Sequence, residues 1–362
     1  MEKKRTLALL GALIGILAIV LAIFGNPANM AICIACFIRD TAGAFRLHGA
    51  APVQYVRPEI FGIILGATIT ALIRKDFKAT AGSSPATRFI LGFIMMTGAL
   101  VFLGCSFRMI VRMAAGDLNA WLGLIGLAAG AATGTFFLKK GFSLGKAQET
   151  QKASGFVVPV VSVLILALSA GAAFFAASTA GPGSLHAPFW ISLGVGLAIG
   201  AIGQLTRLCT TGAIRNLILA KDFNLLIVLG SFFGVLLIGN LVSTFILPIT
   251  GMSFNLSLTG QPIAHTEVLW NILGLYIFGF AGVLAGGCPF RQLILTGQGS
   301  SDGAMTLLGL TVGAAFAHNF ASVSVAANPA MKILGEATSR GQLMVILSIV
   351  ALFLIAITHK EK

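Results

Sequence analysis

Four short motifs in this chain place a cysteine close to an arginine. They read CIACFIR from Cys33, GCSFR from Gly104, CTTGAIR from Cys209 and GCPFR from Gly287. A neutral thiol is polarizable and a weak S–H donor, so it suits a soft sulfur or selenium atom better than a hard, strongly hydrated one. The nearby guanidinium supplies a fixed positive charge. The combination predicts recognition of a small anion that has a soft end.

The four motifs are related by an internal repeat. The segment that begins at Gly104 matches the one that begins at Gly287, and a second match joins the segments around Cys33 and Cys209. The matched side chains are Cys105 with Cys288, Arg108 with Arg291, Cys33 with Cys209, and Arg39 with Arg215. A lone cysteine in a membrane segment is usually a small buried hydrophobe, and a lone arginine often reaches to water at the membrane surface. Recurrence at matched positions favours a function for these residues.

Cys36 stands apart from this set, because Gly212 occupies its place in the repeat. For Cys36 the role of a small buried hydrophobe is favoured. With Cys33 it also forms a C-x-x-C pair, a spacing typical of redox pairs and metal sites. No second pair of this kind accompanies it, so redox and metal chemistry are minor alternatives.

The composition identifies the solvent in which these motifs lie. Hydrophobic residues make up 57% of the 362 residues and charged residues only 10%, with a mean hydropathy of +0.96. Since a soluble domain carries about a quarter charged residues, we predict an all-α polytopic membrane protein. Ten apolar stretches could cross most or all of a hydrocarbon core about 30 Å thick. They lie near residues 6–24, 58–73, 88–103, 119–138, 156–178, 187–205, 223–247, 266–285, 303–320 and 340–358.

Lysines and arginines set the expected orientation, because cytoplasmic loops retain them. They are concentrated in the loops 74–88 and 139–152 and in the tail that holds Lys360 and Lys362, whereas the loops 179–186 and 248–265 contain none. Both termini are therefore expected in the cytoplasm, and the first apolar stretch is expected to be a retained span rather than a secretory signal. These loops and the motif arginines account for most of the net charge of +13, so nucleic acid is not an expected partner.

The repeat predicts two membrane halves, residues 1–178 and 179–362. Each contributes five spans, and because five is odd the second half must enter the membrane in the opposite sense, as in many transporters. The motif segments are too short to cross and are expected to be re-entrant. They cover residues 27–38, 105–115, 207–220 and 288–298. We expect short helices that meet at the constriction of an hourglass-like path, where helix N-termini and arginines favour an anion.

The sequence contains no pattern of an enzyme or an energised pump. No aspartate or glutamate falls in the middle of a predicted span, where many proton relays have one. There is no Walker A motif and no evident set of nucleophile, base and orienting group. We therefore predict facilitated or channel-like transport, with no enzymatic activity, metal or cofactor.

The motifs resemble segments of proteins in a known family. GNPANMAICIACFIRD near the N-terminus, GCSFR, RLCTTGAIRN and GGCPFR are similar to segments of the YeeE/YedE membrane proteins, and the resemblance covers essentially the whole chain. That family includes TsuA-type thiosulfate importers and a branch linked to selenium metabolism, which the N-terminal segment resembles most. By this resemblance Cys105, Cys209 and Cys288 would pass the substrate inward, with Cys33 as an additional thiol. The family also implies a TusA-like sulfur carrier as a cytosolic partner.

These observations lead to one hypothesis and two alternatives. The chain is expected to import a small sulfur- or selenium-containing anion, such as thiosulfate, across the inner membrane of a bacterium through a path lined by cysteine and arginine. One alternative is a membrane thiol oxidoreductase that uses Cys33 and Cys36. The other is a path for Cu(I), which also favours sulfur ligands. The arginines oppose it, because two unit charges about 5 Å apart repel by about 3 kcal/mol at an effective dielectric constant of 20.

Overall fold

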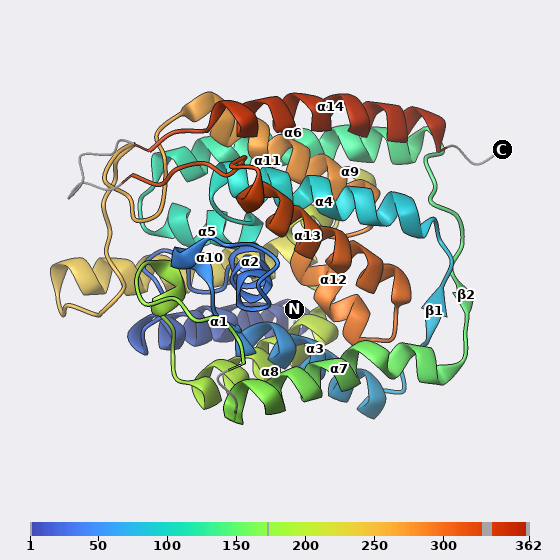
Figure 1. Cartoon of the computed structure of the whole chain (residues 1–362), viewed down its shortest axis with the longest axis horizontal. Helices are drawn as coiled ribbons and strands as arrows, with labels where there is room; N and C mark the ends of the chain where they lie inside the picture. The colour runs from blue at the N-terminus through green and yellow to red at the C-terminus, as the bar shows by residue number, and fades with distance from the viewer. Residues whose placement is uncertain (1, 172–173, 328–334, 360–362) are drawn as a thin grey trace.

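A computed structural model describes residues 2–171, 174–327 and 335–359. Helices predominate in these residues, which also include two short strands, β1 (Thr80–Ala81) and β2 (Gln148–Glu149), that pair antiparallel (Figure 1). Within the described residues, nine helical segments are long and apolar enough to cross a membrane by length and composition. The prediction of an all-α polytopic membrane protein is therefore confirmed.

Ten long helices lie close to the ten predicted spans. They are α1 (Glu2–Ile23), α3 (Pro58–Ile73), α4 (Pro85–Phe102), α6 (Leu118–Lys139), α7 (Lys152–Gly171), α8 (Phe189–Thr206), α10 (Asn224–Phe245), α11 (Val268–Leu284), α13 (Ser301–Asn319) and α14 (Ser339–Thr358). Of these, α13 is the one that is not among the candidate membrane spans in the described part of the chain, because it is less apolar than the others. Two short 3-10 helices, η1 (Ala51–Val53) and η2 (Pro182–Ser184), lie in loops.

Four short helices carry the motifs, and they are α2 (Ile34–Ala44), α5 (Ser106–Ala114), α9 (Thr210–Ala220) and α12 (Pro289–Gly297). Three of them follow a long helix after a sharp break. Leu103 and Arg207 have left-handed backbones with φ of 61° and 54°, and Gly286 has φ of 85°. Since a left-handed residue is a common helix C-terminal signal, these residues end α4, α8 and α11 before the motifs begin.

Two boundaries differ from the expectation. The first motif helix was expected at residues 27–38, but residues 26–33 are irregular and α2 continues to Ala44. The positive φ angles of Asn29 and Ala31 interrupt the helical pattern there. The predicted span 156–178 is shorter at its C-terminal end, because α7 ends at Gly171; residues 172–173 lie outside the described residues, as do Lys360 and Lys362.

The long helices pack in pairs, α6 with α11, α3 with α8, α4 with α13 and α1 with α10. The spacing of Gly62 with Gly66, of Gly309 with Gly313 and of Gly230 with Gly234 predicts close helix contacts. At Gly66 this is confirmed, since a Cβ atom there would lie 2.1 Å from the carbonyl oxygen of Leu197. For Gly230 and Gly234 the prediction is wrong, because a Cβ atom on either residue would have no heavy atom within 4 Å. Gly230 is exposed and Gly234 is half-buried.

The loops gather at two ends of the molecule. At the end shown on the right of Figure 1, β1 pairs with β2 and the Ser143 N–H donates to the carbonyl of His359. We call this the basic-loop end, since it carries the lysine-rich loops. At the opposite end, residues 50–57 contact residues 178–185, and the loop after α10 bonds to the residues between α5 and α6. The boundary between the halves and their opposite sense in a membrane stay predictions.

The contrast between the glycines can be measured. Gly66→Ala is expected to lower the thermal unfolding midpoint of the purified protein, because the added methyl group collides with backbone of α8. Gly230→Ala adds the same group into open space and should leave the midpoint unchanged or raise it slightly, since alanine favours a helix by about 1 kcal/mol over glycine. Equal losses in both variants would contradict this packing.

Candidate functional site

Each of the four repeat-related cysteines is the N-cap residue of a short helix. Cys33, Cys105, Cys209 and Cys288 have extended backbones and directly precede α2, α5, α9 and α12. All four are buried, with relative exposures of 0%, 1%, 4% and 0%. The unpaired N–H groups and the positive end of the helix dipole therefore point toward the thiols, as an anion site requires.

Two of the thiols replace the usual hydroxyl cap. The sulfur of Cys33 accepts from the Cys36 N–H at 3.4 Å, and the sulfur of Cys209 accepts from the Gly212 N–H at 3.1 Å. Cys36 and Gly212 hold the same place in the repeat, so the same bond is made twice. Cys105 and Cys288 make no side-chain cap bond.

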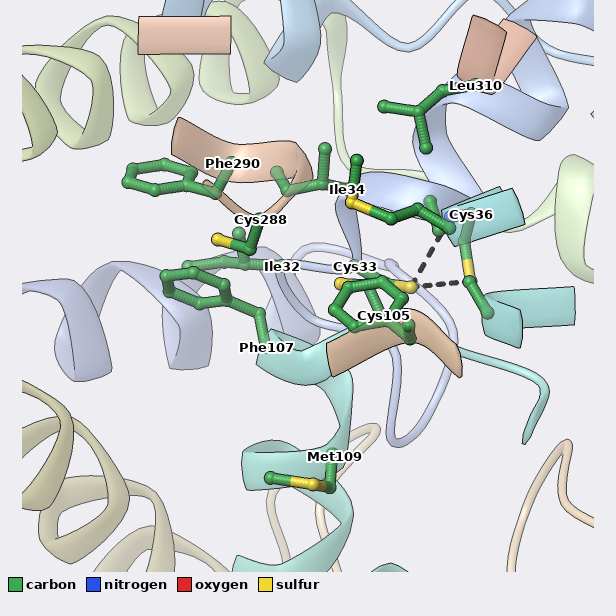
Figure 2. Close-up of a cluster of buried hydrophobic side chains, with 14 of the residues drawn as sticks. Ile32, Cys33, Ile34, Cys36, Cys105, Phe107, Met109, Cys288, Phe290 and Leu310 are labelled. Atoms are coloured by element: carbon green, nitrogen blue, oxygen red, sulfur yellow. Dashed lines mark hydrogen bonds between the residues drawn. The ribbon is translucent and has the colours of Figure 1, made fainter. Parts of the chain in front are cut away.

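The cysteines form two groups. Cys33, Cys36 and Cys105 lie side by side, with the sulfurs of Cys33 and Cys36 2.7 Å apart and Cys105 within bonding reach of Cys33 (Figure 2). We call them the three-thiol cluster. Sequence reasoning set Cys36 apart, and the C-x-x-C spacing was the signal for its place here. Cys209 and Cys288 form the two-thiol cluster, in which the Cys288 N–H donates to the sulfur of Cys209 at 3.3 Å.

Aromatic rings and hydroxyl groups lie beside the thiol clusters. Phe107 and Phe290 hold matched places in the repeat, and their ring centroids are 4.8 Å apart. In Figure 2, Cys288 lies between these two rings and the labelled cysteines of the three-thiol cluster. The hydroxyls of Ser106 and Thr210 are 2.5 Å apart. The constriction of an hourglass-like path stays a prediction.

Arg108 is held by backbone carbonyls. Its guanidinium is fully buried and donates to the carbonyls of Asn29 at 2.9 Å, Leu103 at 2.5 Å and Ile263 at 3.1 Å, and to the sulfur of Cys36 at 3.6 Å. All three carbonyls belong to residues with positive φ, which is uncommon outside glycine and rare for a β-branched residue such as Ile263. The surroundings hold these unfavourable backbones in place.

The contacts of Arg108 join two loop segments at the opposite end. Residues 26–32 and 255–263, which we call the lid segments, each give it one carbonyl, and the Asn29 amide also donates to Gln261 at 3.1 Å. The lid segments lie next to the three-thiol cluster, whose members are 0% or 1% exposed. Arg108 therefore keeps this end closed.

Arg39 is paired with a carboxylate that it shares with a second arginine. Its guanidinium donates to Asp40 at 2.7 Å, and Arg57 bonds to the other carboxylate oxygen at 2.8 Å. All three side chains are buried, and Arg57 was not recognised from the sequence. Arg112 is likewise buried and bonds to Asp117 at 2.6 Å. These arginines have protein partners, as buried charges require.

Arg291 and Arg215 have a different setting, because both line a cavity of about 610 Å³ near the basic-loop end. Cys209 lies in its wall, and Arg291 is close enough for its charge to act on Cys209 and Cys288. Among the described residues, Nη1 of Arg291 is buried without a hydrogen-bond partner. Lys3 and Arg207 also line the cavity, although the repeat did not single them out.

The lid contacts generate a prediction about thiol access. Arg108→Lys keeps the positive charge but loses the planar guanidinium that bonds to several carbonyls at once. Hydrogen bonds to charged groups contribute about 1.5–3 kcal/mol, so their loss should loosen the lid segments. In a background with Cys209→Ser and Cys288→Ser, maleimide should label the three-thiol cluster at least about tenfold faster than in the parent. Arg291→Lys is the matched control and should leave the rate unchanged. Equal rates in both variants, with intact size-exclusion profiles, would contradict the closing role.

Comparison with known proteins gives one family. The profile of a family described as sulphur transport matches residues 1–133 and 205–360, which include all four motifs. No curated protein matches the chain. A family match over most of the chain agrees with the motif resemblance, and the chain therefore belongs to the sulphur transport family of YeeE/YedE membrane proteins.

Proposed function

We propose that this protein imports a small sulfur- or selenium-containing anion, such as thiosulfate, and passes it between the two thiol clusters. The family and the membrane helices support transport of a sulfur-containing anion. In the proposal the two halves, residues 1–178 and 179–362, have opposite senses in a bacterial inner membrane. The basic-loop end faces the cytoplasm, as the distribution of lysine and arginine favours, and so do both termini.

The observation that carries the proposal is the position of the thiols. Four cysteines sit at helix N-termini in two clusters, and Figure 2 shows Cys288 of one cluster facing the three-thiol cluster, with the Phe107 and Phe290 rings beside it. A soft sulfur or selenium atom can accept weak bonds from the S–H groups, while the helix N-termini favour its negative charge. The anion would meet Cys33 and Cys105 first, and Cys288 and Cys209 next.

The four arginines of the motifs differ in how much of their charge is available to an anion. Arg108 and Arg39 give the three-thiol cluster a positive surrounding, but most of their donors already bind protein groups. Arg291 and Arg215 line the open cavity and are the ones placed to meet the anion directly. A TusA-like carrier protein on the cytoplasmic side would then receive the substrate.

Uptake measurements test the path. Cys105→Ala, Cys209→Ala and Cys288→Ala should each reduce uptake of labelled thiosulfate or a selenium anion by proteoliposomes to background, because each removes an S–H donor from the path. Cys36→Ala is the matched control, since it removes a thiol of the same cluster that lacks a repeat partner, and most of the uptake should remain. Normal uptake in all three path variants would rule the mechanism out.

A second candidate is favoured by one contact, the 2.7 Å separation of the Cys33 and Cys36 sulfurs. A thiol oxidoreductase would oxidise these two thiols to a disulfide, passing two electrons and two protons to a quinone-type acceptor. The discriminating measurement is thiol trapping with an alkylating reagent during uptake. The transporter proposal expects all five cysteines to be trapped as thiols. A Cys33–Cys36 disulfide that accumulates with substrate would favour the enzyme.

A further inference from the structure

The cavity at the basic-loop end has an unusual charge balance. Four cationic side chains line it, those of Lys3, Arg207, Arg215 and Arg291, against the single carboxylate of Asp222. The Asp222 carboxylate already accepts a hydrogen bond of 2.9 Å from the Asn224 N–H at the start of α10. The cavity therefore has an excess of positive charge.

The same cations lack ion-pair partners. In residues 2–171, 174–327 and 335–359, none of the four forms a salt bridge within 4.0 Å. Of the buried arginines elsewhere, Arg39, Arg57 and Arg112 pair with aspartate, and Arg108 bonds to backbone carbonyls. Arg207 and Arg215 also lie close enough to Arg291 for their charges to repel. Like charges held together in a partly buried space favour binding of an anion.

The donors around the cavity indicate the class of anion. Guanidinium and ammonium groups and the side-chain amides of Asn216 and Asn224 are hard N–H donors that match oxygen atoms. Among the described residues of the lining, Cys209 is the one soft donor and none is aromatic. A volume of about 610 Å³ admits a small hydrated anion with ease. The lining thus fits a compact dianion with several oxygen atoms.

We infer that this cavity is a binding site for a tetrahedral oxyanion of the sulfate type, held by Arg291, Arg215 and Arg207 beside Cys209. The site differs in chemistry from the thiol clusters, because oxygen atoms are recognised here and a soft atom there. A sulfate-type anion lacks the soft end needed at the thiols and stays in the cavity. A consequence for transport follows and rests on the proposed function. A sulfate-type anion that binds from the cavity side occupies the exit of the path and slows import of the substrate.

Direct binding tests the site without any transport. Labelled sulfate should bind the purified protein saturably, and Arg291→Gln or Arg215→Gln should weaken binding about tenfold or more, since each variant removes a charged hydrogen-bond donor from the site. Arg74→Gln is the matched control, because Arg74 is exposed and pairs with Asp76 away from the cavity. Two independent variants guard against one that misfolds.

The outcomes separate this inference from the proposed function. Saturable binding that depends on the cavity arginines supports the site even if no uptake is found. Absent binding, or binding unchanged in both variants, overturns it. Arginine-dependent retention of phosphatidylglycerol in place of sulfate would also overturn it in favour of a lipid headgroup. With binding established, sulfate on the cavity side of proteoliposomes should slow thiosulfate uptake, and the same sulfate on the other side should not.

Discussion

Breaking a helix inside a membrane leaves backbone N–H groups that water cannot reach, and the rest of this structure depends on how those groups are satisfied. The chain breaks its helical segments before α5, α9 and α12 and starts α2 after an irregular stretch. At each start a cysteine takes the N-cap position. Cys33 and Cys209 accept backbone N–H groups with sulfur, so their S–H groups are left to donate elsewhere. One residue type thus completes the fold and offers a soft donor.

Much of this arrangement could be predicted because its signals are local or repeated. Apolar runs located the long helices, and matched Cys and Arg positions located the short ones. The structure of residues 26–33 could not be predicted, since it depends on the side chain of Arg108 and on carbonyls from distant segments. The pairing of Arg57 with Asp40 was missed for the same reason, as the two residues meet only when α2 and α3 pack. The packing role assigned to Gly230 and Gly234 failed because spacing does not tell which face of α10 meets a neighbour.

The repeat is also broken where the two clusters differ. Arg108 and Arg291 hold matched positions, yet Arg108 is enclosed by carbonyls and Arg291 faces a cavity. Cys36 adds a third thiol where the other half has Gly212. The Ser106 and Thr210 hydroxyls that meet beside the thiol clusters correspond in the repeat to Pro289 and Ile34, which have no hydroxyl to offer. Two related halves therefore present different surfaces to an anion arriving from either side.

The hydrogen bonds of Arg108 bear on how fast the segments that it joins could separate. One side chain holds carbonyls from the α1–α2 loop, the end of α4 and the α10–α11 loop. Separating these segments breaks several hydrogen bonds to the same guanidinium. In the proposed transport, each additional 1.4 kcal/mol that these bonds contribute to the closed state would lengthen its lifetime about tenfold.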